Sequence, residues 1–296
     1  MMLVTGCCDI KINLTLRVLD KRGDGYHNIC SLFWRRPSPE FVQADFSAER
    51  DKLIVTGAEI SGENILSAAC RHIRKVYGDS FLPPVEIILH KRLPLGGGVG
   101  AGSGNAAALL RLVSVAVGFG DDAMFPGVES LGADVAFLAS GQNLAIAGGI
   151  GDVLRRVEGN LSMSGMIFFP SWSASTANAY RELDEARAVG RCGGLLSEEE
   201  ARDEAAAVLS SLLSGGKVGR IPNDFTVCAG HEEEYALLED LASSSGAVVW
   251  GLCGSGSGYF VFFRPEDADA GMRRVFRWVR EKKDSLKWLR QILVLE

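Results

Sequence analysis

The chain has 296 residues, of which 47% are hydrophobic and 23% are charged, and its formal net charge is −6. This composition is typical of a globular protein and excludes a disordered chain. The acidic balance argues against a nucleic-acid partner, because binding to a phosphate backbone requires a clustered basic surface. A nucleotide ligand stays open, since backbone N–H groups and a metal ion can meet its charge. At roughly 150 residues per domain, the length suggests two domains.

The sequence shows no signal for a membrane, a disulfide framework or a zinc site. No apolar run approaches the roughly 20 residues of a membrane span, and residues 1–8 lack the features of a signal peptide. We therefore expect a cytoplasmic protein without a membrane partner. The seven cysteines include no C-x-x-C pair, which favours free thiols, and the four histidines lie far apart in the sequence.

In the first half of the chain, apolar residues alternate with polar ones over residues 10–19, which predicts a half-buried strand. A turn at 20–25 follows. The remaining predicted elements of this half are strands at 29–34, 52–56 and 85–89, helices at 64–76, 105–117 and 127–139, and strands at 143–147 and 153–157. The segment 105–117 is apolar on most of its surface, which predicts a buried helix.

The pattern restarts near residue 160 with a predicted strand at 166–169. Helices are expected at 176–188, 198–213, 232–243 and 266–283, and strand-like segments at 247–250 and 259–263. Strands and helices are mixed without strict alternation, which favours an α+β fold.

The most distinctive segment is the glycine run that precedes the buried helix. Residues 94–104 read PLGGGVGAGSG, with six glycines between positions 96 and 104. Glycine lets a backbone approach a ligand closely, and a loop that opens into a helix directs N–H groups toward an anion. A flexible linker is disfavoured, because the run lies between a strand and a buried helix.

Two other phosphate-binding motifs are also rich in glycine and must be compared with this run. The P-loop pattern is absent, because no Lys-Ser/Thr pair follows the glycines. A dinucleotide-binding fingerprint can be placed on Gly96, Gly98 and Ala101, with Asp121 or Asp122 as its acid. That acid should end a second parallel strand, whereas the pattern puts these residues between two helices, so an oxidoreductase is disfavoured.

Three polar residues are candidates for a functional role. Lys11 and Asn13 share one face of the first predicted strand, which for a lone lysine would be a solvated face. Asp134 lies three residues after Leu131 and four before Leu138, on the apolar stripe of a predicted helix at 128–139. A carboxylate there needs a partner or a function, because burial of a charge is costly. An N-cap role would require a helix of about six residues, which is short.

Together these motifs resemble the GHMP kinase superfamily, and within it the kinases of 4-diphosphocytidyl-2-C-methyl-D-erythritol in the non-mevalonate isoprenoid pathway. The resemblance runs in order from about residue 9 to residue 263. The segments that carry it are Lys11–Asn13, Asp24–His27, Pro94–Ser103, Leu131–Val135, Asn223-Asp224 and Gly254–Gly256.

The resemblance implies an α+β fold with an S5-domain-2-like N-terminal domain at 1–158, a ferredoxin-like C-terminal domain at 159–296, and the active site between them. It implies a kinase that phosphorylates the 2-hydroxyl of the cytidyl substrate with ATP and Mg²⁺, with unknown metal ligands. By resemblance, Asp134 is the catalytic base and Lys11 holds the reacting hydroxyl. The implied ATP-binding residues are Asn64, Lys91, Pro94, Gly96, Gly97, Gly98, Gly100, Gly102, Ser103 and Gly104. The implied substrate residues are Asn13, Tyr26, His27, Thr176 and Tyr180.

Three positions depart from the family pattern. Gly104 stands where the family has a second serine, Cys253 replaces a serine or threonine, and Trp34–Pro39 replaces a more acidic segment that continues a strand. The sequence leaves open another GHMP kinase, acting on mevalonate-like alcohols or homoserine, and a non-catalytic nucleotide-binding relative. We expect a small-molecule substrate, no nucleic acid, and a monomer or homodimer.

Overall fold

The computed structural model describes residues 3–60, 62–119 and 125–296, and the chain divides into two compact units that are interleaved in sequence. Unit 1 is formed by Met1–Lys11, Arg35–Leu93 and Gly100–Asn143. Unit 2 is formed by Ile12–Trp34, Pro94–Val99 and Leu144–Glu296. The division at residue 158 that the family resemblance implies stays a prediction about domains. Asp121 and Asp122, the acids of the disfavoured dinucleotide motif, lie outside the described residues.

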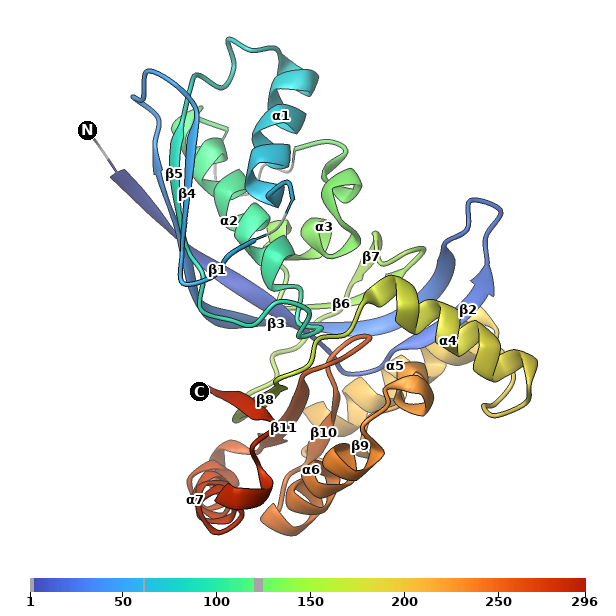
Figure 1. Ribbon diagram of the computed structural model, residues 1–296. Coiled ribbons are helices and arrows are strands. Elements are labelled where there is room, and N and C mark those ends of the chain that lie inside the picture. Colours follow the sequence, from blue (N-terminus) through green and yellow to red (C-terminus); the bar gives the residue numbers. More distant parts are fainter. Residues whose placement is uncertain (1–2, 61, 120–124) are drawn as a thin grey trace. The chain divides into compact units, whose positions relative to one another are not determined.

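Unit 1 combines strands with three helices, which lie together beside the strands in Figure 1. Strand β4 pairs in parallel with β5, and β5 pairs antiparallel with the second half of β3. The elements are β1 (Leu3–Asn13), β3 (His27–Asp45), β4 (Lys52–Thr56), α1 (Ile65–Tyr77), β5 (Glu86–His90), α2 (Ala101–Ala116), the 3₁₀ helix η1 (Val128–Leu131) and α3 (Ala133–Ala139). Strands β1 and β3 both continue into unit 2.

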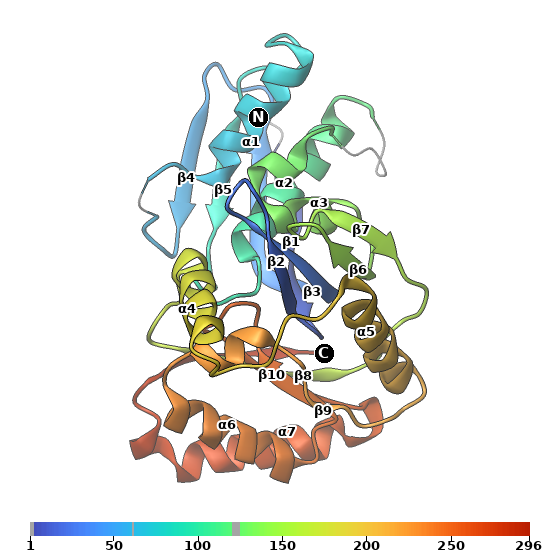
Figure 2. The ribbon, with the colours of Figure 1, turned by 90° about the vertical axis from the view of Figure 1, so that its right-hand side faces the viewer.

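Unit 2 contains a five-stranded sheet in the order β12-β8-β11-β10-β9, and helices α6 and α7 pack against it (Figure 2). Its core is rich in aromatic residues, including Phe168, Trp250 and Phe263. The first half of β3 pairs with both β2 and β6. Strand β6 also pairs with β7. The elements are β2 (Arg17–Lys21), β6 (Leu144–Gly148), β7 (Val153–Arg156), β8 (Ser164–Pro170), α4 (Thr176–Ala188), α5 (Glu198–Leu213), β9 (Gly219–Arg220), η2 (Asp224–Cys228), α6 (Glu232–Ser245), β10 (Val249–Leu252), β11 (Tyr259–Phe263), α7 (Pro265–Glu281), η3 (Lys283–Ser285) and β12 (Leu289–Leu295).

The α+β prediction is confirmed, and several predicted elements have the bounds that the sequence indicated. Helices α4 and α5 and strands β4 and β11 begin and end at the predicted residues. Side-chain caps explain the two helix starts, because Ser175 accepts from an N–H of the first turn of α4 and Ser197 forms a capping box with Glu200 in α5.

Three predicted elements were wrong in their extent. The strand expected at 10–19 is two strands, β1 and β2, with a break at residues 14–16. The helix expected at 127–139 is interrupted at Gly132, so that α3 has only seven residues. The strand expected at 29–34 is the 19-residue strand β3, which also contains the segment Trp34–Pro39 with its two prolines. Strands β9 and β12 were not predicted, since each pairs with a strand distant in sequence.

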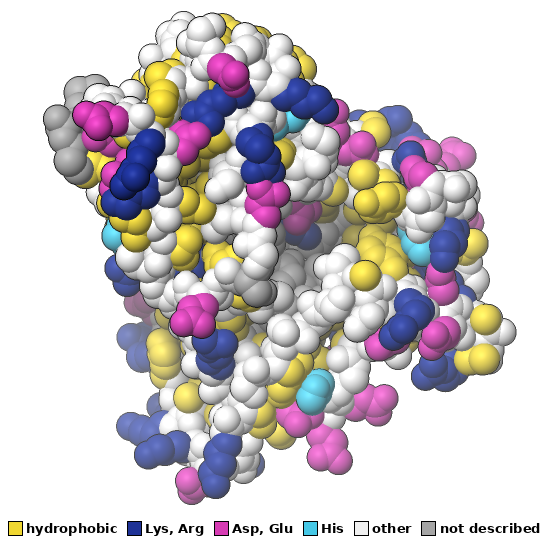
Figure 3. All heavy atoms as spheres, turned by 45° about the horizontal axis from the view of Figure 1, so that its top comes forward, with side chains coloured by type: hydrophobic (Ala, Val, Ile, Leu, Met, Phe, Trp, Pro, Cys, Tyr) yellow, Lys and Arg dark blue, Asp and Glu magenta, His cyan; other side chains and the backbone are white. Residues whose placement is uncertain are grey.

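The surface carries charges of both signs. On the face in Figure 3, Lys and Arg side chains are interspersed with Asp and Glu. Across residues 3–60, 62–119 and 125–296, no helix combines the length and the apolar character that crossing a membrane requires.

Candidate active site

Strand β1 and helix α3 bring Lys11 and Asp134 together in unit 1. Lys11 Nζ lies 3.6 Å from Asp134 Oδ2, and their side chains are 8% and 25% exposed. The solvated-face interpretation of Lys11 is therefore wrong, because its side chain is almost fully buried. A carboxylate that solvent still reaches can accept a proton, and a desolvated ammonium group beside it can stabilise developing negative charge.

Asp134 is the second residue of α3, with Gly132 at the N-cap. The carboxylate therefore lies in the first turn of the helix, close to its N-terminal backbone N–H groups. The predicted position on the stripe of a long helix was wrong, because the helix begins at Ala133. The consequence is a partly exposed carboxylate rather than a buried one.

Gly100, in the middle of the glycine run, lies against the Lys11–Asp134 pair. Gly100 is the N-cap of α2 and has φ of +64°, a left-handed conformation that favours glycine. A Cβ atom added there would lie 3.0 Å from Asp134 Oδ2 and 3.2 Å from Lys11 Cγ. The run thus places the N-terminus of α2 beside the two candidate catalytic groups.

Gly104 has a packing role that the sequence did not reveal. A side chain at this position would collide with the backbone carbonyl of Asp9 in β1. Gly104 is therefore required for the close contact between α2 and β1. By contrast, an added Cβ at Gly102 would meet no atom within 4 Å. The serine that the family pattern has at this position would not fit here without a shift of α2 or β1.

The first half of the glycine run belongs to unit 2, where it packs on a second glycine motif, the GSGSG segment at residues 254–258. The N–H of Ser257 donates to the carbonyl of Gly96 at 3.0 Å, and the N–H of Gly258 donates to that of Gly97 at 3.2 Å. Gly98 has φ of +74°, and a Cβ there would collide with the carbonyl oxygen of Cys253. Cys253 thus takes part through its backbone, and its replacement of a hydroxyl residue leaves this contact intact.

Two of the implied ATP-binding residues, Asn64 and Lys91, have different surroundings in unit 1. Asn64 caps α1, since its Oδ1 accepts from the N–H of Leu66 at 2.9 Å. Its buried Nδ2 has no hydrogen-bond partner among the described residues, which leaves a donor for a ligand. The Lys91 ammonium group is 2.8 Å from the Glu40 carboxylate, with side-chain exposures of 2% and 0%. A contact between Lys91 and a nucleotide would therefore come from its backbone.

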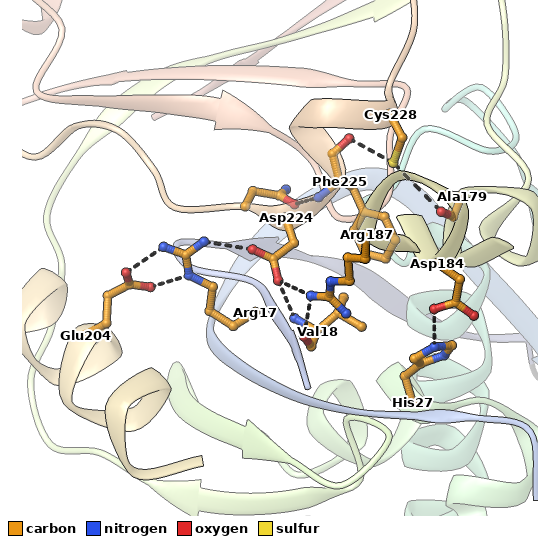
Figure 4. Close-up of polar contacts among 11 residues, drawn as sticks. Arg17, Val18, His27, Ala179, Asp184, Arg187, Glu204, Asp224, Phe225 and Cys228 are labelled. Carbon is orange, nitrogen blue, oxygen red and sulfur yellow. Dashed lines mark hydrogen bonds and ion pairs between the residues drawn. The ribbon is translucent and has the colours of Figure 1, made fainter. Parts of the chain in front are cut away.

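A second group of candidate residues forms around His27 in unit 2. His27 Nε2 lies 2.8 Å from Asp184 Oδ1 (Figure 4). The rings of His27 and Tyr180 stack with their centroids 5.0 Å apart. Lys21 Nζ donates to the other oxygen of Asp184 at 2.8 Å. Partial burial by itself would raise the pKa of Asp184, but hydrogen bonds from Lys21 and His27 together hold it below its usual range. Asp184 fixes the orientation of a buried imidazole.

The other predicted substrate residues of unit 2 differ in exposure. Tyr26 is 62% exposed, so that its ring is available to a planar ligand. Asn13 is fully buried and donates to Ser31 Oγ at 2.8 Å. Thr176, the first residue of α4, lies 3.3 Å from Ser255 of the second glycine motif, between their hydroxyl oxygens.

Asp224 holds the strand that leads to Tyr26 and His27. Its carboxylate accepts hydrogen bonds from Arg17 at 2.7 Å, from Arg187 at 2.9 Å and from the N–H of Val18 at 2.9 Å (Figure 4). These bonds connect β2, α4 and η2. The motif Asn223-Asp224 therefore stabilises the surroundings of the site, and its contacts are to protein groups.

Sequence reasoning missed Glu40 and Asp184. Asp184 follows Tyr180 by four residues on α4, so the helical period placed both on one face and could have revealed it. Glu40 had no local signal, because its partners are 51 and 65 residues away in sequence. Among the described residues, no group of three His, Cys, Asp or Glu side chains could hold a metal ion by itself.

Both the sequence and the fold of the chain are similar to those of known kinases. Residues 64–154 match the family model of the GHMP kinases N terminal domain. A 4-diphosphocytidyl-2-C-methyl-D-erythritol kinase of Porphyromonas gingivalis is 31% identical over 280 residues, covering 90% of this chain and 96% of that protein. Its counterpart from Chlorobium luteolum is 33% identical over 263 residues, covering 86% of each chain. A crystal structure of a 4-(cytidine 5'-diphospho)-2C-methyl-D-erythritol kinase matches with a TM-score of 0.73 at 26% identity, covering 99% of this chain and 98% of the other.

Proposed function

Because the chain belongs to the 4-diphosphocytidyl-2-C-methyl-D-erythritol kinase family of GHMP kinases, we propose that it transfers the γ-phosphoryl group of ATP to the 2-hydroxyl of this cytidyl alcohol. The observation that carries the proposal is the contact of the Lys11–Asp134 pair with Gly100, at the N-terminus of α2. This arrangement places a proton acceptor and a buried cation beside a glycine loop suited to phosphates.

In the proposed reaction, the Asp134 carboxylate takes the proton of the 2-hydroxyl as that oxygen forms a bond to the γ-phosphorus. The bond between the γ-phosphorus and the β–γ bridging oxygen breaks, and ADP leaves. Lys11 holds the hydroxyl and offsets the negative charge that develops during transfer. Such phosphoryl transfer depends on positioning and electrostatics more than on covalent chemistry.

ATP is the phosphoryl donor, and we propose that its phosphates bind at the open side of Gly102 and Ser103, where α2 begins. Mg²⁺ is held mainly by phosphates and water in such sites. The Ser103 hydroxyl and the Asp134 carboxylate are oxygen ligands of the kind that Mg²⁺ prefers. The Ser103 hydroxyl lies near Gly132, and the Asp134 carboxylate lies near Gly100. The ion, bound to ATP, would neutralise phosphate charge.

We propose that the cytosine ring is recognised by Tyr26, His27 and Tyr180. The exposure of the Tyr26 ring and the fixed orientation of His27 support this assignment. We expect the enzyme to act in the cytoplasm, as a monomer or homodimer.

The test is ADP release with Mg-ATP and one acceptor at a time: the cytidyl methylerythritol, mevalonate or homoserine. Turnover of the cytidyl compound alone is the expected result. Turnover with only mevalonate or homoserine would refute the substrate while leaving the kinase class intact. ATP binding without turnover of any acceptor would refute the kinase activity.

A further inference from the structure

A buried ion pair lies next to the glycine loop and takes no part in the proposed chemistry. Lys91, the residue after β5, places its ammonium group 2.8 Å from the carboxylate of Glu40 on β3. The two side chains are 2% and 0% exposed. An ion pair this deeply buried requires further hydrogen bonds to offset the loss of hydration.

The additional bonds of Glu40 go to both ends of the loop Pro94–Gly104. Its Oε1 accepts from the backbone N–H of Arg92 at 3.1 Å and of Leu93 at 2.8 Å, just before the loop. Its Oε2 accepts from Asn105 Nδ2 at 2.7 Å, just after the loop. One carboxylate therefore joins the residues where the chain enters and leaves the loop.

Lys91 and Asn105 complete a closed set of contacts that we call the Glu40 brace, consisting of Glu40, Lys91, Asn105 and the N–H groups of Arg92 and Leu93. Lys91 neutralises Glu40 and also lies 3.4 Å from Asn105 Oδ1. A buried ion pair of this kind adds little net stability over apolar residues of the same size, but it specifies geometry strictly. The brace therefore constrains where the two ends of the loop lie.

We propose that Glu40 is a positioning residue for ATP: through the Glu40 brace it holds the two ends of the phosphate loop at the separation that ATP binding requires. This inference rests on the proposed function, because the loop is taken to bind ATP. Lys91 acts on the nucleotide site indirectly, because its ammonium group neutralises the charge of the Glu40 carboxylate.

The first test is Glu40→Gln, which keeps the shape of the side chain but turns one acceptor oxygen into a donor facing other donors. Calorimetric titration with Mg-ATP, without an acceptor, should show a loss of affinity of about tenfold or more, because small displacements of a binding loop are costly. Hydrogen exchange at Arg92 and Leu93 should accelerate. The matched control is Glu86→Gln, which alters the exposed Lys52–Glu86 pair of β4 and β5 and should leave ATP affinity unchanged.

The second test moves the charge within the brace. In Glu40→Gln with Asn105→Asp, the new amide group can donate to the new carboxylate, and Lys91 can pair with that carboxylate. The glutamine oxygen still accepts from Arg92 and Leu93. We expect the double variant to recover most of the ATP affinity that the single variant loses.

A purely structural role would give a different result. If Glu40→Gln lowers the unfolding temperature while the folded protein binds ATP with wild-type affinity, the inference is overturned. It is also overturned if the double variant binds ATP no better than the single one. Wild-type protein that binds ATP but does not phosphorylate the cytidyl substrate would refute the proposed function alone, whereas failure of the wild type to bind ATP would refute both.

Discussion

Replacement of Gly100 by alanine should impair both stability and catalysis. A left-handed backbone conformation costs an L-residue about 1–2 kcal/mol, and Gly100 has φ of +64°. The new Cβ would also lie 3.0 Å from Asp134 Oδ2, closer than van der Waals contact, so the carboxylate must move by a few tenths of an ångström. We expect a loss of about 1–3 kcal/mol in the free energy of unfolding. Displacement of the proposed base should lower kcat by about 10–100-fold.

Gly102→Ala in the same loop is the informative comparison. It lies in the first turn of α2, and its added Cβ meets no atom within 4 Å. Alanine favours a helix over glycine by up to about 1 kcal/mol, so stability should be kept or raised. The Cβ would enter the space where we propose the phosphates bind, so the KM for ATP should rise.

The assay combines thermal unfolding with steady-state kinetics in both substrates. Gly194→Ala, at a position with open space and no left-handed backbone, should match the wild type in all respects. Unchanged kcat and unfolding temperature for Gly100→Ala would refute the reasoning. The same profile for the Gly100 and Gly102 variants would refute the separate roles of the two glycines.

Three further predictions concern the two ends of the proposed substrate. Asp134→Asn should lower kcat by about 10²–10⁴-fold, the usual contribution of a positioned general base; a near-normal rate would show that the carboxylate is structural. Asp184→Asn should raise the KM for the cytidyl substrate, with KM for ATP unchanged, because the amide keeps a single acceptor oxygen, for which Lys21 and His27 then compete, and His27 is held less firmly. Since the folded-state pKa of Asp184 is lowered, its contribution to stability is complete above its usual pKa of about 3.9 and is lost as pH falls through the lowered value. Unfolding temperatures of this variant and the wild type should therefore converge only below about pH 4. Tyr26→Ala should raise the KM for the cytidyl substrate far more than that for ATP, without loss of stability since the ring is 62% exposed; equal effects on both KM values would contradict a cytosine role.

The sequence alone determined the features that depend on residues close along the chain. Helix α4 begins at Thr176 because Ser175 caps it, and β11 is a short apolar run bounded by glycine and a helix start. The glycine run and its position before a buried helix were likewise visible in the sequence, and the resemblance carried by the motifs identified the family.

The tertiary structure decided which of these residues meet. The same kind of lysine is a partner of Asp134 at position 11 and of Glu40 at position 91, and nothing near either residue in sequence distinguishes the two. Gly104 belongs to the glycine run in sequence but serves the contact of α2 with the backbone of Asp9, 95 positions earlier. Local patterns report the period and ends of an element, whereas the partner of a buried charge depends on how distant elements pack, because only packing removes water from around it.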